Sequence, residues 1–179
     1  MSVDWRRQVL KFWFALDPER WWNGGAELDN QIKLRFLKLW TEKRQLPVEA
    51  FLDDPLTALA GVILFDQFPR NMFRGHAEQF ATDPLALGIA KAAIAKGLDE
   101  QLPADERAFL YMPFQHSENR DDQNRSMLLF TALGDAKNLQ YAKKHHDVIE
   151  RFGRFPHRNA ILGRAARPEE IAAGDVFPW

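Results

Sequence analysis

Apolar residues recur at helical spacing in several segments of the chain. Between residues 4 and 16, and again between 29 and 44, every third or fourth position is apolar. This period predicts amphipathic helices that bury one face, and Asp29 is a residue type that caps helix N-termini. No stretch shows the two-residue alternation of a half-buried strand. The pattern therefore predicts an all-α protein.

Proline and glycine mark the ends of the other predicted helices. Asp54-Pro55 and Asp83-Pro84 each combine a capping aspartate with a proline at the first helical position. The helix that starts at Asp54 should end before Pro69, and Pro113 should kink or end the helix it lies in. We expect seven to nine helices, stacked as antiparallel hairpins in a single domain covering residues 1–179. The remaining helices are predicted over 71–80, 83–97, 103–116, 121–133 and 135–152.

Composition limits the possible functions. The chain has 179 residues, of which 46% are hydrophobic, with six Trp and fourteen Phe, so it can build a core. The formal net charge of −1 disfavours a general nucleic-acid binder. The chain has no Cys, which excludes disulfides and thiolate chemistry. Charges interrupt the first apolar run, and no run approaches the roughly 18 residues of a membrane span. These features predict a cytoplasmic protein without a membrane segment.

Two segments combine arginines with aromatic residues. Residues 151–164 contain four arginines and one histidine, and the first acid after them is Glu169. Residues 65–75 are a shorter version of the same pattern. Both segments contain Phe-Pro, then Arg-Asn, then a glycine. A solvated basic surface does not need the aromatics, and a plain core does not need the arginines. We therefore predict that the two segments meet at one polar site.

The arginines of these segments suggest an anion site. A guanidinium group binds a phosphate or carboxylate through two parallel hydrogen bonds, and a turn that starts near Asn159 would offer backbone N–H groups. In the alternative interpretation, Asn71 and Asn159 are ordinary helix caps, and the arginines pair with Asp66, Glu118 and Glu150. The candidate ligand-binding residues are Arg70, Asn71, Arg74, Arg154, His157, Arg158, Asn159 and Arg164.

A third polar segment, residues 111–118, supplies candidate catalytic groups. His116 is a candidate general acid or base, with Glu118 or Asp66 to orient it. Ser117 lacks the glycine-rich surroundings of a nucleophilic serine. His145 lies on an apolar helix face and is interpreted as a core or groove residue. The neighbouring arginines disfavour a bound dication, and the chain has no phosphate-loop or dinucleotide motif, so we expect neither a metal nor a cofactor.

The three segments together resemble a bacterial family known as domain of unknown function number 924. The matching stretches are 65–75, 111–118 and 151–164, together with Val9 to Phe14 near the start of the chain. The resemblance implies an all-α fold similar to that of tetratricopeptide-repeat proteins, and it implies no reaction. Ala166-Arg167 stands where the family usually has Ser-Thr, so the last helix is expected to fray. His76 stands where the family usually has Thr.

Two functions from different classes remain open at this stage. The first is the binding of a small anionic ligand, phosphorylated or carboxylated, with acid–base catalysis as an extension. The second is a tetratricopeptide-like module that binds a protein or peptide partner, with structural polar motifs. RNA binding through arginines and aromatics is a third hypothesis, which the near-neutral charge disfavours. The sequence does not decide whether the protein is an enzyme.

Overall fold

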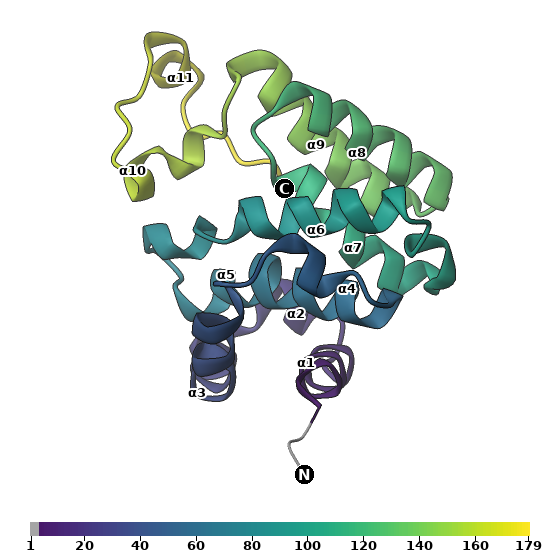
Figure 1. Ribbon diagram of the computed structural model, residues 1–179. Helices are drawn as coiled ribbons and strands as arrows, with labels where there is room; N and C mark the ends of the chain where they lie inside the picture. Colours follow the sequence, from purple (N-terminus) through teal and green to yellow (C-terminus); the bar gives the residue numbers. More distant parts are fainter. Residues whose placement is uncertain (1–3) are drawn as a thin grey trace. The chain divides into compact units, whose positions relative to one another are not determined.

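The computed structural model describes residues 4–179 (Figure 1). This part of the chain contains no β-strand, which confirms the all-α prediction. Its longer helices are α1 (Trp5–Phe14), α3 (Gly25–Lys43), α4 (Pro55–Val62), α6 (Asp83–Ala95), α7 (Ala104–His116), α8 (Arg120–Leu133) and α9 (Ala136–Phe152). Its shorter helical segments are α2 (Arg20–Asn23), η1 (Val48–Phe51), η2 (Ile63–Gln67), α5 (Phe68–Met72), η3 (Ala77–Phe80), η4 (Asp99–Gln101), η5 (Pro156–Arg158), α10 (Asn159–Leu162) and α11 (Pro168–Ala173).

The chain divides into two compact units, which meet in sequence at Leu110 and Tyr111. Helix α7 begins in the first unit and ends in the second. Each unit is described by itself. The single domain over residues 1–179 and the stacked, tetratricopeptide-like hairpins therefore stay predictions.

Aromatic side chains fill the core of the first unit. Helix α4 contacts both α1 and α6, and α3 contacts α5 (Figure 1). The ring of Phe68 is fully buried and lies within 6.1 Å, centroid to centroid, of the rings of Phe12, Trp13 and Phe36. Such ring pairs stabilise a core beyond the area they bury. The apolar faces that the sequence predicted for the first two helices therefore line this core, because Phe12 and Trp13 lie on α1 and Phe36 lies on α3.

The helix before Pro69 does not end where the sequence predicted. It passes through the π-helical turn η2 and continues as α5, which contains Pro69. Proline has no N–H to donate to the carbonyl four residues earlier, which is that of Phe65. The hydroxyl of Thr82 donates to this carbonyl at 2.7 Å instead, and it accepts a bond from the indole of Trp40 at 3.1 Å. A wider turn and a substitute donor therefore carry the helix past the proline.

Three capping predictions need correction. Asp83 is the first residue of α6, and the N-cap position belongs to Thr82. Gly24 precedes α3, so Asp29 lies inside the helix instead of capping it. Asn71 lies inside α5, and the turn η3 is capped by the ring of His76, which accepts from the N–H of Glu78 at 3.2 Å. In all three cases the side chain that was expected to cap a helix has another partner, because caps and buried carboxylate contacts use the same residue types.

The second unit is built on the helix pair α8 and α9 (Figure 1). Asn119 caps α8, Asp135 caps α9, and α9 ends at Gly153, whose φ of 71° is the left-handed conformation that glycine adopts without strain. Pro113 lies inside α7, which continues to His116. A small apolar cluster holds the end of α9 against the C-terminal segment: Val148, Ile149, Phe152 and Phe155, with Ala173 and Val176 packed on it.

Within residues 4–179, no helix combines the length and apolar composition that a membrane-spanning segment needs.

Candidate functional site

In the first unit, Arg70 is held between two aspartates. Its guanidinium donates to both carboxylate oxygens of Asp83, at 2.8 and 3.0 Å, and lies 3.6 Å from the carboxylate of Asp66. It also donates to the backbone carbonyl of Asp66. Burial acts to lower the pKa of Arg70, but the charges of Asp83 and Asp66 outweigh it and raise the pKa. The fully buried Asp66 also accepts from the side chain of Gln67 at 2.7 Å.

Asn71 and Arg74 share a second carboxylate in this unit. The amide of Asn71 donates to Asp29 of α3 at 2.9 Å. The guanidinium of Arg74 donates to both oxygens of the same carboxylate, at 2.7 and 2.9 Å. Burial acts to raise the pKa of Asp29, but these hydrogen bonds and the charge of Arg74 lower it. Arginine and asparagine thus recognise one carboxylate jointly.

In the second unit, a guanidinium group and a backbone N–H converge on the carboxylate of Glu118. Arg164 donates to both oxygens of this carboxylate, at 2.8 and 3.0 Å, and the N–H of Phe155 donates at 2.8 Å. Burial acts to raise the pKa of Glu118, but the hydrogen bonds from Arg164 and Phe155 and the charges of Arg158 and Arg164 lower it. Glu118 is therefore an ionised acceptor near neutral pH and a poor proton donor.

A second carboxylate, Glu170 of α11, lies in the same network. Arg154 donates to its two oxygens at 2.6 and 2.8 Å, Asn159 donates at 3.0 Å, and the N–H of Arg167 donates at 2.8 Å. The hydrogen bond from Arg154 is the largest cause that lowers the pKa of Glu170 to about 2. Through the bond from Arg167, the residue before α11, Glu170 folds back on the start of its own helix. The expected fraying of α11 stays a prediction.

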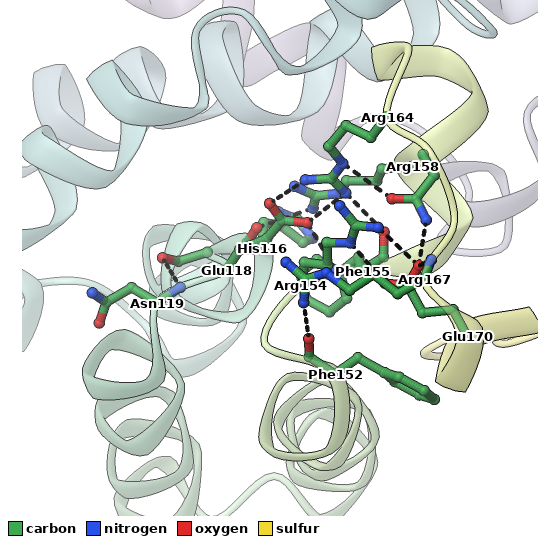
Figure 2. A network of polar contacts seen from close by, with 12 residues as sticks. His116, Glu118, Asn119, Phe152, Arg154, Phe155, Arg158, Arg164, Arg167 and Glu170 are labelled. Atoms are coloured by element: carbon green, nitrogen blue, oxygen red, sulfur yellow. Dashed lines mark hydrogen bonds and ion pairs between the residues drawn. The ribbon is translucent and has the colours of Figure 1, made fainter. Parts of the chain in front are cut away.

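Asn159 joins the two carboxylates into one network. Its amide N–H donates to Glu170, while its amide oxygen accepts from Arg164 at 3.0 Å. Figure 2 shows the side chains of Arg154, Arg158, Arg164 and Arg167 turned toward this same region. Asn159 is the first residue of the four-residue α10 and does not cap it. It links the guanidinium of Arg164 to the carboxylate of Glu170, which Arg154 also binds.

Arg158 and the histidines border this network. The guanidinium of Arg158 donates to the carbonyl of His116 at 3.0 Å and lies over the ring of Phe155, 4.6 Å from its centroid. The ring of His157 lies 5.0 Å from that of Trp179. Arg158 is 7% exposed. These contacts bring four of the candidate residues, Arg154, Arg158, Asn159 and Arg164, together with His116 and Glu118.

His145 is buried, in agreement with its interpretation as a core or groove residue. Its Nδ1–H donates to the carbonyl of Tyr141 at 2.8 Å, and its ring lies 6.0 Å from that of His116 and 5.6 Å from that of Phe155. Burial, followed by the charges of His116, Arg158 and His157, lowers its pKa to about 3. His145 is therefore neutral at physiological pH.

Ser117 has a structural role at the start of α8. Its hydroxyl donates to Asp122 at 2.7 Å and accepts from the N–H of Asn119 at 3.2 Å. Such a contact orders a helix start and does not activate a nucleophile. In the part of the chain that the structure describes, no three His, Asp or Glu side chains are arranged to hold a metal ion.

The predicted residues fall into both units. Asp66, Arg70, Asn71 and Arg74 lie in the first unit, and the other candidates lie in the second, so the meeting of the two motifs stays a prediction. Sequence reasoning missed the acceptors Asp29, Asp83 and Glu170. Asp29 and Asp83 stand near predicted helix starts, and their residue type is also typical of helix caps. Glu170 follows Pro168 at the third position of a helix, which is where a carboxylate folds back on the helix start.

Comparison with solved structures finds the protein of unknown function ATU0120 from Agrobacterium tumefaciens. It is 39% identical, with a TM-score of 0.86, and the match covers 94% of this chain and 95% of that one. No curated protein matches the chain. The family model described as bacterial protein of unknown function, DUF924, matches residues 9–173. Because this match spans most of the sequence, the chain belongs to the DUF924 family.

Proposed function

We propose that the polar network of the second unit binds a small anionic molecule that carries a carboxylate or phosphate group. The observation that supports this most is the way in which Glu118 is held. Two bonds from the Arg164 guanidinium and one from the Phe155 N–H converge on its carboxylate. These are the donors that a ligand carboxylate or phosphate requires. The side chain of Glu118 is 28% exposed, so solvent reaches it.

The charges of the network also favour an anion. Leaving Arg158 aside, Arg154, Arg164 and Arg167 carry three positive charges, and Glu118 and Glu170 carry two negative charges. The exposed Arg167 directs its guanidinium to the carbonyl of Phe152 at 3.1 Å. Like charges held close together repel each other. A bound anion would offset this repulsion. It would accept hydrogen bonds from those guanidinium N–H groups of Arg164 and Arg167 that are not bonded within the network.

Acid–base catalysis is an extension of the same proposal. His116 is the residue that would move a proton, because its carbonyl accepts from Arg158 and places the backbone of the residue beside the network. Glu118 would position the ligand indirectly, through Arg164, and would not exchange a proton itself, since its pKa is lowered. Asp66 lies in the first unit, and its part in this chemistry depends on the predicted meeting of the two motifs.

Thermal denaturation and calorimetric titration with inorganic phosphate, sulfate and citrate test the binding proposal. The wild-type protein should be stabilised by at least one of these anions beyond an ionic-strength control with chloride. Arg164→Gln and Arg167→Gln should each weaken binding roughly tenfold, the loss of one charge-assisted hydrogen bond. Arg151→Gln is the matched control. It removes an exposed arginine of the same segment that stacks on Phe152 outside the network, so binding should not change.

Glu118→Gln separates a ligand site from a structural pair. The variant keeps an oxygen for the Phe155 N–H but removes the negative charge that competes with a ligand. Anion binding should therefore become tighter by roughly tenfold. If none of the anions stabilises the wild type beyond chloride, and Glu118→Gln binds none of them either, the proposal is wrong and the network serves only to hold the fold.

The second candidate function is a protein or peptide interaction module. It is favoured by the exposure of two aromatic residues at the end of the second unit, Phe177 at 53% and Trp179 at 63%. Their rings lie 5.2 Å apart, so they form a continuous apolar surface of the kind that anchors interfaces. Affinity capture with the wild-type chain and with a Phe177→Ser/Trp179→Ser variant would test it. A stoichiometric partner captured only by the wild type is the expected result.

A further inference from the structure

The first unit contains a cavity of about 440 Å³ whose lining includes no residue of the arginine motifs. The start of α1, the end of α3 and the segment from Leu46 to Thr57 line it. Its size falls within the range of roughly 300–1,000 Å³ that small-molecule sites occupy. None of the residues discussed for anion binding contributes to this cavity, so it is independent of the proposed function.

Two aromatic rings form the apolar wall of the cavity. Trp5 and Phe51 meet edge to face, with ring centroids 6.2 Å apart. Phe51 is fully buried, and Trp5 is partly exposed. Phe51 therefore belongs to the core, whereas Trp5 is accessible to a ligand from solvent. An apolar or aromatic group of a ligand would pack on the indole without disturbing the core.

Two of the charged residues at the cavity, Asp4 and Arg6, already bind each other. Arg6 donates to both carboxylate oxygens of Asp4, each at 2.9 Å, and to Asp54 and the hydroxyl of Thr57 at 2.9 and 3.0 Å. Asp4 also caps α1 by accepting from the N–H of Arg6. These contacts join the start of α1 to the start of α4 and leave this pair little capacity to bind a ligand.

The other two charged residues at the cavity, Lys43 and Asp53, are available to bind a ligand. The ammonium group of Lys43 lies 5.3 Å from the centre of the Trp5 ring, and the carboxylate of Asp53 is exposed. Among residues 4–179, neither group forms an ion pair within 4.0 Å. The two groups are therefore not paired with each other, although both border the same cavity. The cavity offers one positive and one negative group beside an apolar wall.

We propose that this cavity binds a free α-amino acid with an apolar or aromatic side chain. The carboxylate of the amino acid would bind Lys43, its ammonium group would bind Asp53, and its side chain would pack on Trp5. A simple anion would meet the attraction of Lys43 and the repulsion of Asp53, and a simple cation would meet the reverse. A zwitterion satisfies both groups, which selects it over either single ion.

Calorimetric titration of the full chain with L-phenylalanine and L-leucine tests the proposal, with N-acetylphenylalanine and phenylalanine amide as single-charge analogues. Each analogue lacks one of the two charges and should bind at least roughly tenfold more weakly. Lys43→Gln and Asp53→Asn should each weaken phenylalanine binding by a similar factor. Lys38→Gln is the matched control, because Lys38 lies on the same helix with its side chain 90% exposed.

Two results would overturn this inference. In the first, neither amino acid binds the wild-type protein at concentrations up to about 10 mM, the weak end of specific small-molecule affinity. In the second, binding occurs but both single-charge analogues or both variants match the wild-type affinity, so the paired charges play no part. Because Lys43 and Asp53 make no ion pair within the described residues, their substitution should leave the fold intact, which circular dichroism verifies.

Discussion

The two Phe-Pro segments use the same residue types for the same contact on different backbones. In the first unit, Asn71 and Arg74 converge on the carboxylate of Asp29. In the second, Asn159 and Arg154 converge on the carboxylate of Glu170. Each time, one amide N–H and one bidentate guanidinium hold a single carboxylate. The similarity between the two sequence segments therefore reflects a shared way of binding a carboxylate.

The units differ in what positions these contacts. In the first unit the segment is helical, and its acceptor comes from α3, whose other face packs into the aromatic core. In the second unit the segment is a 3₁₀ turn and a four-residue helix, and its acceptor lies on the short α11. Short helices are not stable by themselves. Packing thus places the ion pairs of the first unit, whereas in the second unit the polar network and a small apolar cluster together hold the C-terminal segment.

Removal of a core aromatic ring should have the largest effect. Phe68→Ala should reduce the free energy of unfolding by about 4 kcal/mol, because it leaves a cavity among three rings. Phe155→Ala should cost less, about 3 kcal/mol, because the apolar cluster around Phe155 is smaller. Urea denaturation measures both. A greater loss for Phe155→Ala would contradict the view that packing matters more in the first unit.

Loss of an ion pair in the first unit should reduce the free energy of unfolding by an amount that depends on how deeply the pair is buried. Arg70→Ala leaves the buried Asp66 and the partly buried Asp83 without their cation, and should cost about 3 kcal/mol. Arg74→Ala is the matched control, because the side chain of Arg74 is 57% exposed. It should cost less than about 1 kcal/mol, as exposed ion pairs do. Equal losses in urea denaturation would show that burial does not separate the two pairs.

Acid should destabilise the second unit through His145. Its folded pKa of about 3 lies below the ordinary value of 6.5, so the unfolded chain binds the proton first. The stability contributed by neutral His145 is full above pH 6.5 and is lost as pH falls toward 3. The expected loss between pH 7 and pH 5 is about 2 kcal/mol. Glu170 adds a loss of the same sign below pH 4.5, since its pKa is lowered to about 2.

The pH effect can be assigned by substitution. His145→Leu should flatten the dependence of unfolding free energy on pH between 7 and 5, whatever its effect at neutral pH. His146→Gln is the control on the same helix, where the imidazole contacts Asn124 at the surface. An unchanged slope in His145→Leu would mean that another group takes up the proton on unfolding.

The two asparagines should have smaller effects than the buried Arg70. Asn71→Ala removes one hydrogen bond to a carboxylate and should cost about 1 kcal/mol. Asn159→Ala removes bonds to Glu170 and from Arg164, and should cost about 2 kcal/mol because Asn159 links two ion pairs. Combining each change with Glu118→Gln gives the coupling energy. Coupling is expected for Asn159, and its absence would show that the network of the second unit is not continuous.

The sequence by itself determined the all-α fold, the period of the buried faces and most of the helix ends. These follow from local rules, since the spacing of apolar residues and the position of glycine and proline act within a few residues. It also located the arginine-rich segments and identified His145 as a core or groove residue. It did not reveal that α5 continues past Pro69, because the substitute donor, Thr82, lies 17 residues from Phe65.

Only the tertiary structure decided which carboxylate each arginine meets. The partners of Arg164 and Arg154 lie 46 and 16 residues away, and that of Arg74 lies 45 residues away. A residue type indicates what a guanidinium can bind, but its partner depends on which elements the folded core brings within 3 Å of it. For the same reason, the sequence located the arginines of residues 151–164, and only the structure showed that Arg164 and the N–H of Phe155 converge on Glu118.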